Sequence, residues 1–154
     1  MKELKRLFLE ELADMYDSER RIVETLPSLI KTATSRKLQR ALQRHLQEAR
    51  GHLAQIKRVF AALDETPIAK KCPAMAGLIE EALAIVRQNK KSPLINAAII
   101  SAAQKIEYYE IASYGILHLW AGMLESEQAS NILQQILDEE KETDHILNHL
   151  ALSI

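Results

Sequence analysis

The chain has 154 residues, of which 47% are apolar and 27% charged, and its 20 basic residues nearly balance its 21 acidic ones. This length suits one domain over residues 1–154 and can bury a core without a disulfide or a structural metal. The basic residues are spread along the chain, which argues against a nucleic-acid-binding protein, and no stretch approaches the roughly 20 apolar residues of a membrane span.

The N-terminal residues and the cysteine content lead us to expect a cytoplasmic protein. The first residues, "MKELKRLFLEEL", lack the apolar segment of a signal peptide. A single cysteine, Cys72, cannot form an internal disulfide and suits a reducing compartment. No base is visible beside Cys72 in the sequence, so we assign it no chemical role.

The first half of the chain predicts two long helices. Only four glycines and four prolines occur, and the commonest residue types favour helix. Apolar residues at steps of three, four and seven predict a helix over about 3–33, in which Pro27 should cause a kink or an early end. Ser35 is the expected N-cap of a second helix over 36–62.

The second half predicts one short and two more long helices. The stretch 64–73, with two prolines, is expected to be a loop, and a short helix follows over 74–89. Ser92 as N-cap and Pro93 at the first position predict a long helix over 93–123, and the last helix should cover 126–150. No segment shows the alternation of a strand.

These elements predict an all-α protein. The short helix falls in the connection between the second and third long helices. Two helical hairpins joined by such a crossover are typical of the ferritin-like four-helix bundle, here with a short extra helix in the crossover. An ordinary up-and-down bundle with a decorated loop is the alternative.

Carboxylates interrupt the apolar face of each long helix near its middle. Residues three or four apart share one face of a helix, which places Glu19 inward between Met15 and Ile22. The same reasoning selects residues on the other three helices: Glu48, Glu107, Glu110 and Glu140, with Asp144 in the row of Glu140. By this pattern Glu139 and Glu142 point away from the core.

Carboxylates that meet at one level of a bundle cannot all stay ionised without partners. Two divalent cations would balance them, and oxygen ligands with an imidazole favour iron or manganese over zinc in a thiolate site. His45 and His52 flank Glu48 on one face, and either could be a ligand or an outer partner of one. The alternative is that these acids are ordinary solvated helix edges.

Several segments resemble the YciF-like family of bacterial stress proteins. They are "LFLEELADMYDSERRIVETLPSLIKTA", "HLQEARGHLAQIKRVFAAL", "KKCPAMAGLIEEA", "AAQKIEYYEIASYG" and "ILDEEKETDHIL", and they cover about residues 5–150 in order. The resemblance implies a ferritin-like bundle related to rubrerythrins and other di-iron carboxylate proteins, a homodimer and a role in general stress.

The resemblance also implies a ligand set. The di-iron pattern has a Glu on each of two helices and Glu-x-x-His on each of the others. Glu19, Glu48, Glu107 and Glu140 match its carboxylates, and Glu110 matches an extra carboxylate of rubrerythrin-like sites. Two positions depart from the pattern, because Gly51 and Thr143 stand where the histidines belong. His52 and Asp144, one residue further on, are then replacements that approach from about 100° around the helix.

Three functions follow from these observations. The first is a stress-related di-metal protein, with iron or manganese, that acts on peroxide; the chain has no Cys-x-x-Cys pair of a built-in electron donor, so the donor is unknown. The second is a non-catalytic dimeric bundle with a vestigial site. The third, iron storage, needs a closed shell of many subunits, and the extra helix and the family's dimers argue against it.

Overall fold

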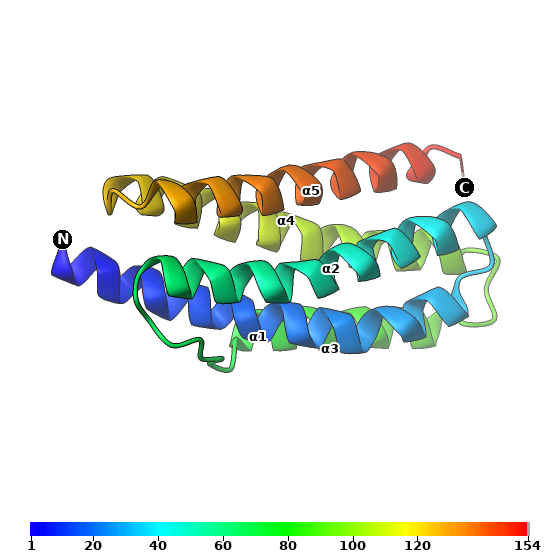
Figure 1. The fold of residues 1–154 in the computed structure, drawn as a ribbon. Helices are drawn as coiled ribbons and strands as arrows, with labels where there is room; N and C mark the ends of the chain where they lie inside the picture. Colours follow the sequence, from blue (N-terminus) through cyan, green and yellow to red (C-terminus); the bar gives the residue numbers. More distant parts are fainter. Residues whose placement is uncertain (154) are drawn as a thin grey trace.

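Five α-helices make up the part of the chain that the computed structural model describes, residues 1–153 (Figure 1). They are α1 (Lys2–Thr32), α2 (Arg36–Ala62), α3 (Pro73–Gln88), α4 (Ile95–Met123) and α5 (Glu127–Ala151). The last position of the domain expected over 1–154 lies outside the described residues. None of the helices in 1–153 is long and apolar enough to cross a membrane.

The four long helices lie side by side as two hairpins. Helix α1 packs on α2, and α4 packs on α5. The hairpins meet where α2 contacts α5 and where α1 contacts α4. The short helix α3 lies against α4 and α1 along one half of the bundle (Figure 1).

Most helix boundaries agree with the sequence patterns, and two details differ. Ser35 caps α2 as expected, since its hydroxyl accepts from the backbone N–H of Leu38. Helix α4 begins at Ile95 rather than 93, because Ser92 and Pro93 form a turn in which the Ser92 carbonyl accepts from the Ile95 N–H. Pro27 is exposed, and α1 continues five residues beyond it.

The core is divided into two apolar parts, one in each half of the bundle. One part includes Ile22, Leu42 and Ile99, and the other includes Met15, Ile56 and Ile136. The inward residues between these two parts are polar. The carboxylates of α1, α4 and α5 and the imidazoles of α2 therefore meet in one buried polar layer.

Cys72 has a structural role that the sequence did not indicate. Its sulfur accepts from the Met75 N–H at 3.4 Å, which caps α3, and lies 3.1 Å from the Tyr109 hydroxyl. The Cys72 N–H donates to Asp17 at 2.8 Å. These contacts attach the start of α3 to both α1 and α4, close to the polar layer.

Candidate metal centre

Two groups of side chains in the polar layer have ligand atoms close enough together to hold a metal ion. The first cluster consists of His45, Glu107, Glu110 and Glu140, and the second consists of Glu19, His52 and Glu140. Within each cluster the ligand atoms lie within 4.8 Å of one another, and every member is buried. Glu140 belongs to both clusters.

Glu140 is placed to join the two clusters. Its Oε2 lies 3.9 Å from Nε2 of His45, while its Oε1 lies 3.1 Å from Nδ1 of His52. The two oxygens of one carboxylate thus face two different imidazoles. This is the arrangement that a carboxylate bridging two metal ions requires.

The first cluster is completed by α4 and α2. Glu107 and Glu110 are three residues apart and share the inward face of α4. Nε2 of His45 lies 3.0 Å from Oε1 of Glu107 and 4.0 Å from Oε1 of Glu110. Both carboxylates are fully buried.

The second cluster is held by hydrogen bonds from two further residues. The Tyr114 hydroxyl donates to Oε1 of Glu19 at 2.6 Å, and Nδ1 of His52 lies 3.1 Å from the same oxygen. The other ring nitrogen of His52, Nε2, is 2.7 Å from Oε2 of Glu139. A carboxylate on the far nitrogen of a metal-binding imidazole fixes its tautomer and orientation, so Glu139 is positioned to orient His52.

Many polar atoms of the clusters have no hydrogen-bond partner in the described chain. They are Oε2 of Glu19, both ring nitrogens of His45, and all six carboxylate oxygens of Glu107, Glu110 and Glu140. Some lie near one another, but not at hydrogen-bonding angles. Native proteins leave few buried polar atoms unsatisfied, and carboxylate oxygens and imidazole nitrogens that converge in one layer suit divalent metal ions as their partners.

Burial and mutual proximity shift the pKa values of the carboxylic acids in the first cluster. Burial, and then the Glu140 carboxylate, raises the pKa of Glu107 and of Glu110 well above the ordinary value. Burial also acts on Glu140, but the neighbouring Glu107 and His52 lower the pKa of Glu140 to about 2. Without metal, burial therefore favours the neutral acid form of Glu107 and Glu110, whereas Glu140 is ionised at neutral pH.

The imidazole of the second cluster is charged in the metal-free chain. Burial favours neutral His52, but the carboxylates of Glu19 and Glu140 outweigh this and raise the pKa of His52 to about 11. Protons thus balance the layer's charges. A metal ion that binds here must displace some of them, so metal binding is coupled to proton release.

Of the residues that the sequence selected, the structure brings five into the clusters: Glu19, His52, Glu107, Glu110 and Glu140. Glu48 and Asp144 lie outside both. The two oxygens of Glu48 accept from Arg44 at 2.9 Å and Thr143 at 3.1 Å, and Asp144 is half-buried and accepts from Asn148.

Helix geometry explains both differences. The inward row of α2 is His45, Ala49 and His52, so Glu48 is turned about 100° from the position that Ala49 fills. The inward row of α5 is Glu140, Thr143 and Leu147, which leaves Asp144 at the edge.

His45 was identified from the sequence only as a possible ligand or partner. Glu139 lies outside the inward row, as expected, and its partly exposed side chain reaches His52 from the edge of α5.

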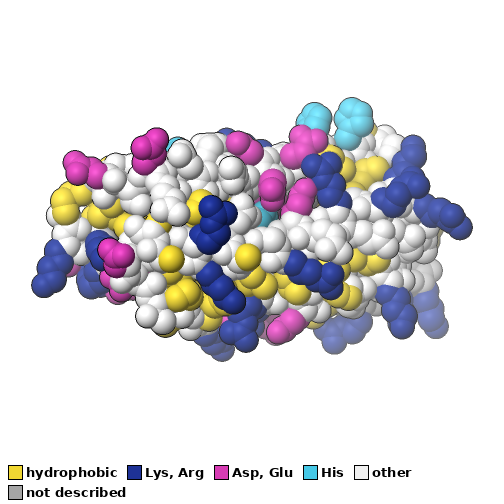
Figure 2. All heavy atoms as spheres, viewed as in Figure 1, with side chains coloured by type: hydrophobic (Ala, Val, Ile, Leu, Met, Phe, Trp, Pro, Cys, Tyr) yellow, Lys and Arg dark blue, Asp and Glu magenta, His cyan; other side chains and the backbone are white. Residues whose placement is uncertain are grey.

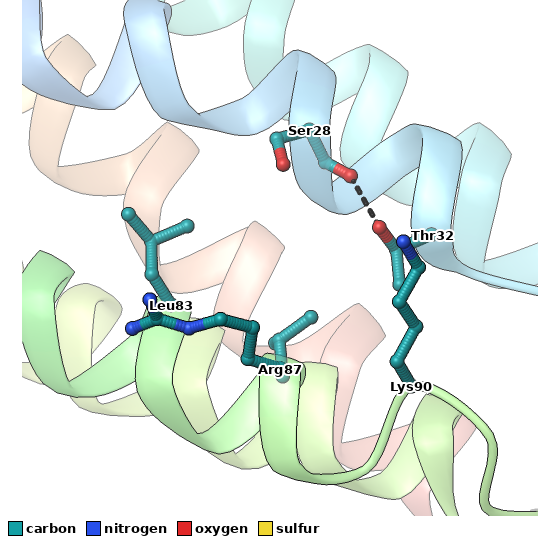
Figure 3. A pocket seen from close by; sticks show the side chains of 6 residues that line it. Ser28, Thr32, Leu83, Arg87 and Lys90 are labelled. Atoms are coloured by element: carbon teal, nitrogen blue, oxygen red, sulfur yellow. Dashed lines mark hydrogen bonds between the residues drawn. The ribbon is translucent and has the colours of Figure 1, made fainter.

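One apolar hollow reaches the candidate centre at His45, where Ile22 and Leu29 of α1 and Ile106 of α4 line it. A cleft of about 280 Å³ lies between α1 and α3, lined by Ser28, Thr32, Leu83, Val86, Arg87 and Lys90 (Figure 3). It shares no residue with the clusters. Because every cluster member is buried, chemistry at the clusters would take place in the interior, and the hollow at His45 offers one approach for a small molecule.

The fold and the clusters define an all-α, five-helix protein with buried His/Glu groups suited to metal ions. The family described as "Domain of unknown function (DUF892)" matches residues 3–154. The chain is 38% identical to Protein YciF of Escherichia coli (strain K12) over 154 residues, covering 99% of this chain and 93% of that protein. The chain therefore belongs to the DUF892, or YciF, family.

Solved structures agree with this assignment. The crystal structure of the E. coli stress protein YciF matches with a TM-score of 0.93 and 38% identity, covering 99% of this chain and 96% of that one. YcfI of Rhodopseudomonas palustris matches with a TM-score of 0.90 and 37% identity, covering 94% and 92%. A protein of Xanthomonas campestris, at 17% identity and a TM-score of 0.76 over 98% and 92% of the chains, shares the fold.

Proposed function

We propose that this protein is a ferritin-like di-metal carboxylate protein of the stress response, in which α3 is an extra helix in the crossover. It holds two iron or manganese ions and reduces a peroxide. The observation that carries the proposal is the shared Glu140, whose two oxygens face the two imidazoles from between two clusters that both contain buried ligand atoms without a hydrogen-bond partner.

The donors of this chain fit two such ions. The first cluster would hold one ion through His45, Glu107 and Glu110, the second would hold the other through Glu19 and His52, and Glu140 would bridge them. Carboxylates with a minority of imidazoles suit iron and manganese, while thiolates are absent from both clusters. The four ionised carboxylates of Glu19, Glu107, Glu110 and Glu140 would together balance the charge of two divalent ions.

Bound metal ions would supply Lewis acidity and one electron each, so that hydrogen peroxide, two protons and two electrons give two molecules of water. The chain's residues hold the ligands and exclude water. Tyr114 orients Glu19, and Glu139 orients His52. An external reductant must restore the electrons.

The proposal is tested by metal content and peroxide consumption. Protein reconstituted with Fe(II) or Mn(II) is expected to hold two ions per chain, and the double variant Glu107→Gln, Glu110→Gln to lose metal. Glu80→Gln, an exposed carboxylate on α3, is the matched control and should bind as the wild type does. Peroxide consumption with an added reductant should then follow metal content across the three proteins. Wild-type protein with no more metal than the double variant would contradict the proposal.

An exposed apolar stripe on α4 supports a second candidate, a non-catalytic dimeric bundle with a vestigial site. Tyr108, Ile116, Leu119 and Met123 share one exposed face and are 56%, 37%, 60% and 58% exposed. Exposed apolar patches mark interaction surfaces, and this one fits a second copy of the chain. Sedimentation of the wild type and of Leu119→Asp separates a dimer from a monomer or a cage, while unchanged function of the Glu107, Glu110 double variant would favour this candidate.

The proposal also places the protein in the cytoplasm, with neither nucleic acid nor membrane as a partner. A reducing compartment would keep Cys72 as a free thiol. In the structure Cys72 is a free cysteine whose sulfur contacts the Tyr109 hydroxyl. Fractionation of cells that express the protein, with Cys72 probed by a thiol reagent after unfolding, tests this location.

A further inference from the structure

Two histidines outside the buried layer lie together on the surface of α5. His145 and His149 are four residues apart, so they stand one turn apart on the same face of the helix. Their ring centroids are 5.9 Å apart and their planes differ by 36°. Figure 2 shows two histidine side chains standing side by side on the surface, with acidic side chains close to them.

Neither ring is engaged by another residue of the described chain. The buried histidines and His118 each have a near polar neighbour, whereas His145 and His149 make no hydrogen bond and no ion pair within residues 1–153. Both are exposed. A solvent-open hollow of about 250 Å³ borders the two rings, with Ile146 and Leu150 as its apolar part. Because both rings are exposed to solvent, an ion can reach them from outside.

The surroundings favour a cation at this place. Glu142 is exposed and lies one turn before His145 on the same face, so rotation of its side chain would bring its carboxylate towards the rings as a third donor. His149 also lies in the last turn of α5, where the free carbonyls give the helix end a partial negative charge.

We propose that His145 and His149, with Glu142, form a surface site for one transition-metal ion of the zinc, nickel or copper(II) class. Imidazole prefers these ions, whereas magnesium and calcium prefer sites made only of oxygen. Two histidines one helical turn apart are a known chelating arrangement. Metal–nitrogen bonds of about 2.0–2.1 Å bring the two ligand nitrogens of a tetrahedral ion to about 3.3 Å, and the exposed side chains can rotate to reach this.

The surface site is independent of the buried clusters, because the two share no residue. It would tie together the last two turns of α5, which as a helix end otherwise opens easily. A surface ion would thus be visible both as bound metal and as local protection of α5, whether or not the proposed di-metal function is correct.

Zinc titration of the full-length protein tests the site. The wild type is expected to bind one zinc ion more than the double variant His145→Ala, His149→Ala, and zinc should slow amide hydrogen exchange over residues 142–151 in the wild type alone. Gln135→Ala with Lys141→Ala, two exposed positions of the same helix, is the matched control and should behave as the wild type does.

Equal zinc binding by wild type and double variant, or zinc binding without added protection at the end of α5, would overturn the proposal. Because both rings are exposed, the double variant should fold as the wild type does, which its thermal unfolding checks. The single variant His149→Gln, which breaks the chelate but keeps one imidazole, gives a second test and should lose the same ion.

Discussion

Replacing Glu107 and Glu110 by glutamine should separate what these side chains do for the fold from what they do for metal. In the metal-free chain, burial and the Glu140 carboxylate raise the pKa of both side chains and so favour their neutral acid form. Glutamine has nearly the same shape as a protonated glutamic acid and carries no charge. Without metal, the free energy of unfolding of the double variant should therefore lie within about 1 kcal/mol of the wild-type value, as expected for a core substitution that conserves volume.

With metal the two proteins should differ widely. An ion at a hundredfold excess over its dissociation constant stabilises the folded chain by about 2.7 kcal/mol. Removal of two ligands should weaken metal affinity by more than the 10–100-fold that disturbing an outer partner of a ligand costs. At the same metal concentration, a site with a hundredfold weaker affinity would stabilise the folded chain by only about 0.4 kcal/mol. For a domain of this size each kcal/mol is about 2–4 °C in melting temperature, so the variant should forfeit roughly 5–9 °C of the metal-induced shift.

The assay is thermal unfolding with and without Mn(II), for the wild type, the double variant and the exposed control Glu80→Gln. The control should show the full metal-induced shift. If Mn(II) raised the melting temperature of the double variant as much as that of the wild type, the assignment of Glu107 and Glu110 as ligands would be refuted. A double variant that is far less stable without metal would refute their assignment as neutral acids.

Three further predictions concern the rest of the layer. Glu139→Gln should weaken Mn(II) binding by about 10–100-fold, because it removes the carboxylate that orients His52; unchanged affinity in a titration would count against that role. Glu48→Gln should keep its metal, measured by elemental analysis, since Arg44 and Thr143 already engage its oxygens; metal loss would return it to the ligand set. Metal-free stability should fall as pH rises from 6.5 towards 11, because the folded chain holds a proton on His52 that the unfolded chain releases, by up to about 1.4 kcal/mol per pH unit; denaturant unfolding at several pH values that shows a rise would contradict this.

The helices and their order could be predicted because periodic apolar residues and caps act locally. Ser35 illustrates this, since a hydroxyl before an apolar stripe is enough to start α2. The start of α4 was misplaced because Ser92 and Pro93 are equally compatible with a cap and with the turn that they form. Which of these wins depends on how α3 is joined to α4, and that is not a local property.

On α2 and α5 the sequence prediction missed the inward position by one residue. An error of one residue is enough to exchange an inward side chain for one at the helix edge. A rotation of about 100° decides whether Glu48 or Ala49 is inward, and an apolar stripe in the sequence is too broad to settle this. The Arg44 contact that holds Glu48 at the edge would have been a usable signal, because a basic residue four positions away offers an ion pair. The His52–Glu139 contact could not be read from the sequence, since it depends on how α2 and α5 are rotated against each other.

The most direct test of the account is a crystal of the protein loaded with Mn(II), examined by anomalous scattering. We predict two buried peaks per chain on either side of Glu140, one near His45 and Glu107 and the other near Glu19 and His52. A well-ordered crystal with no anomalous peak within ligand distance of Glu140 would contradict the account and leave these carboxylates without a role as metal ligands.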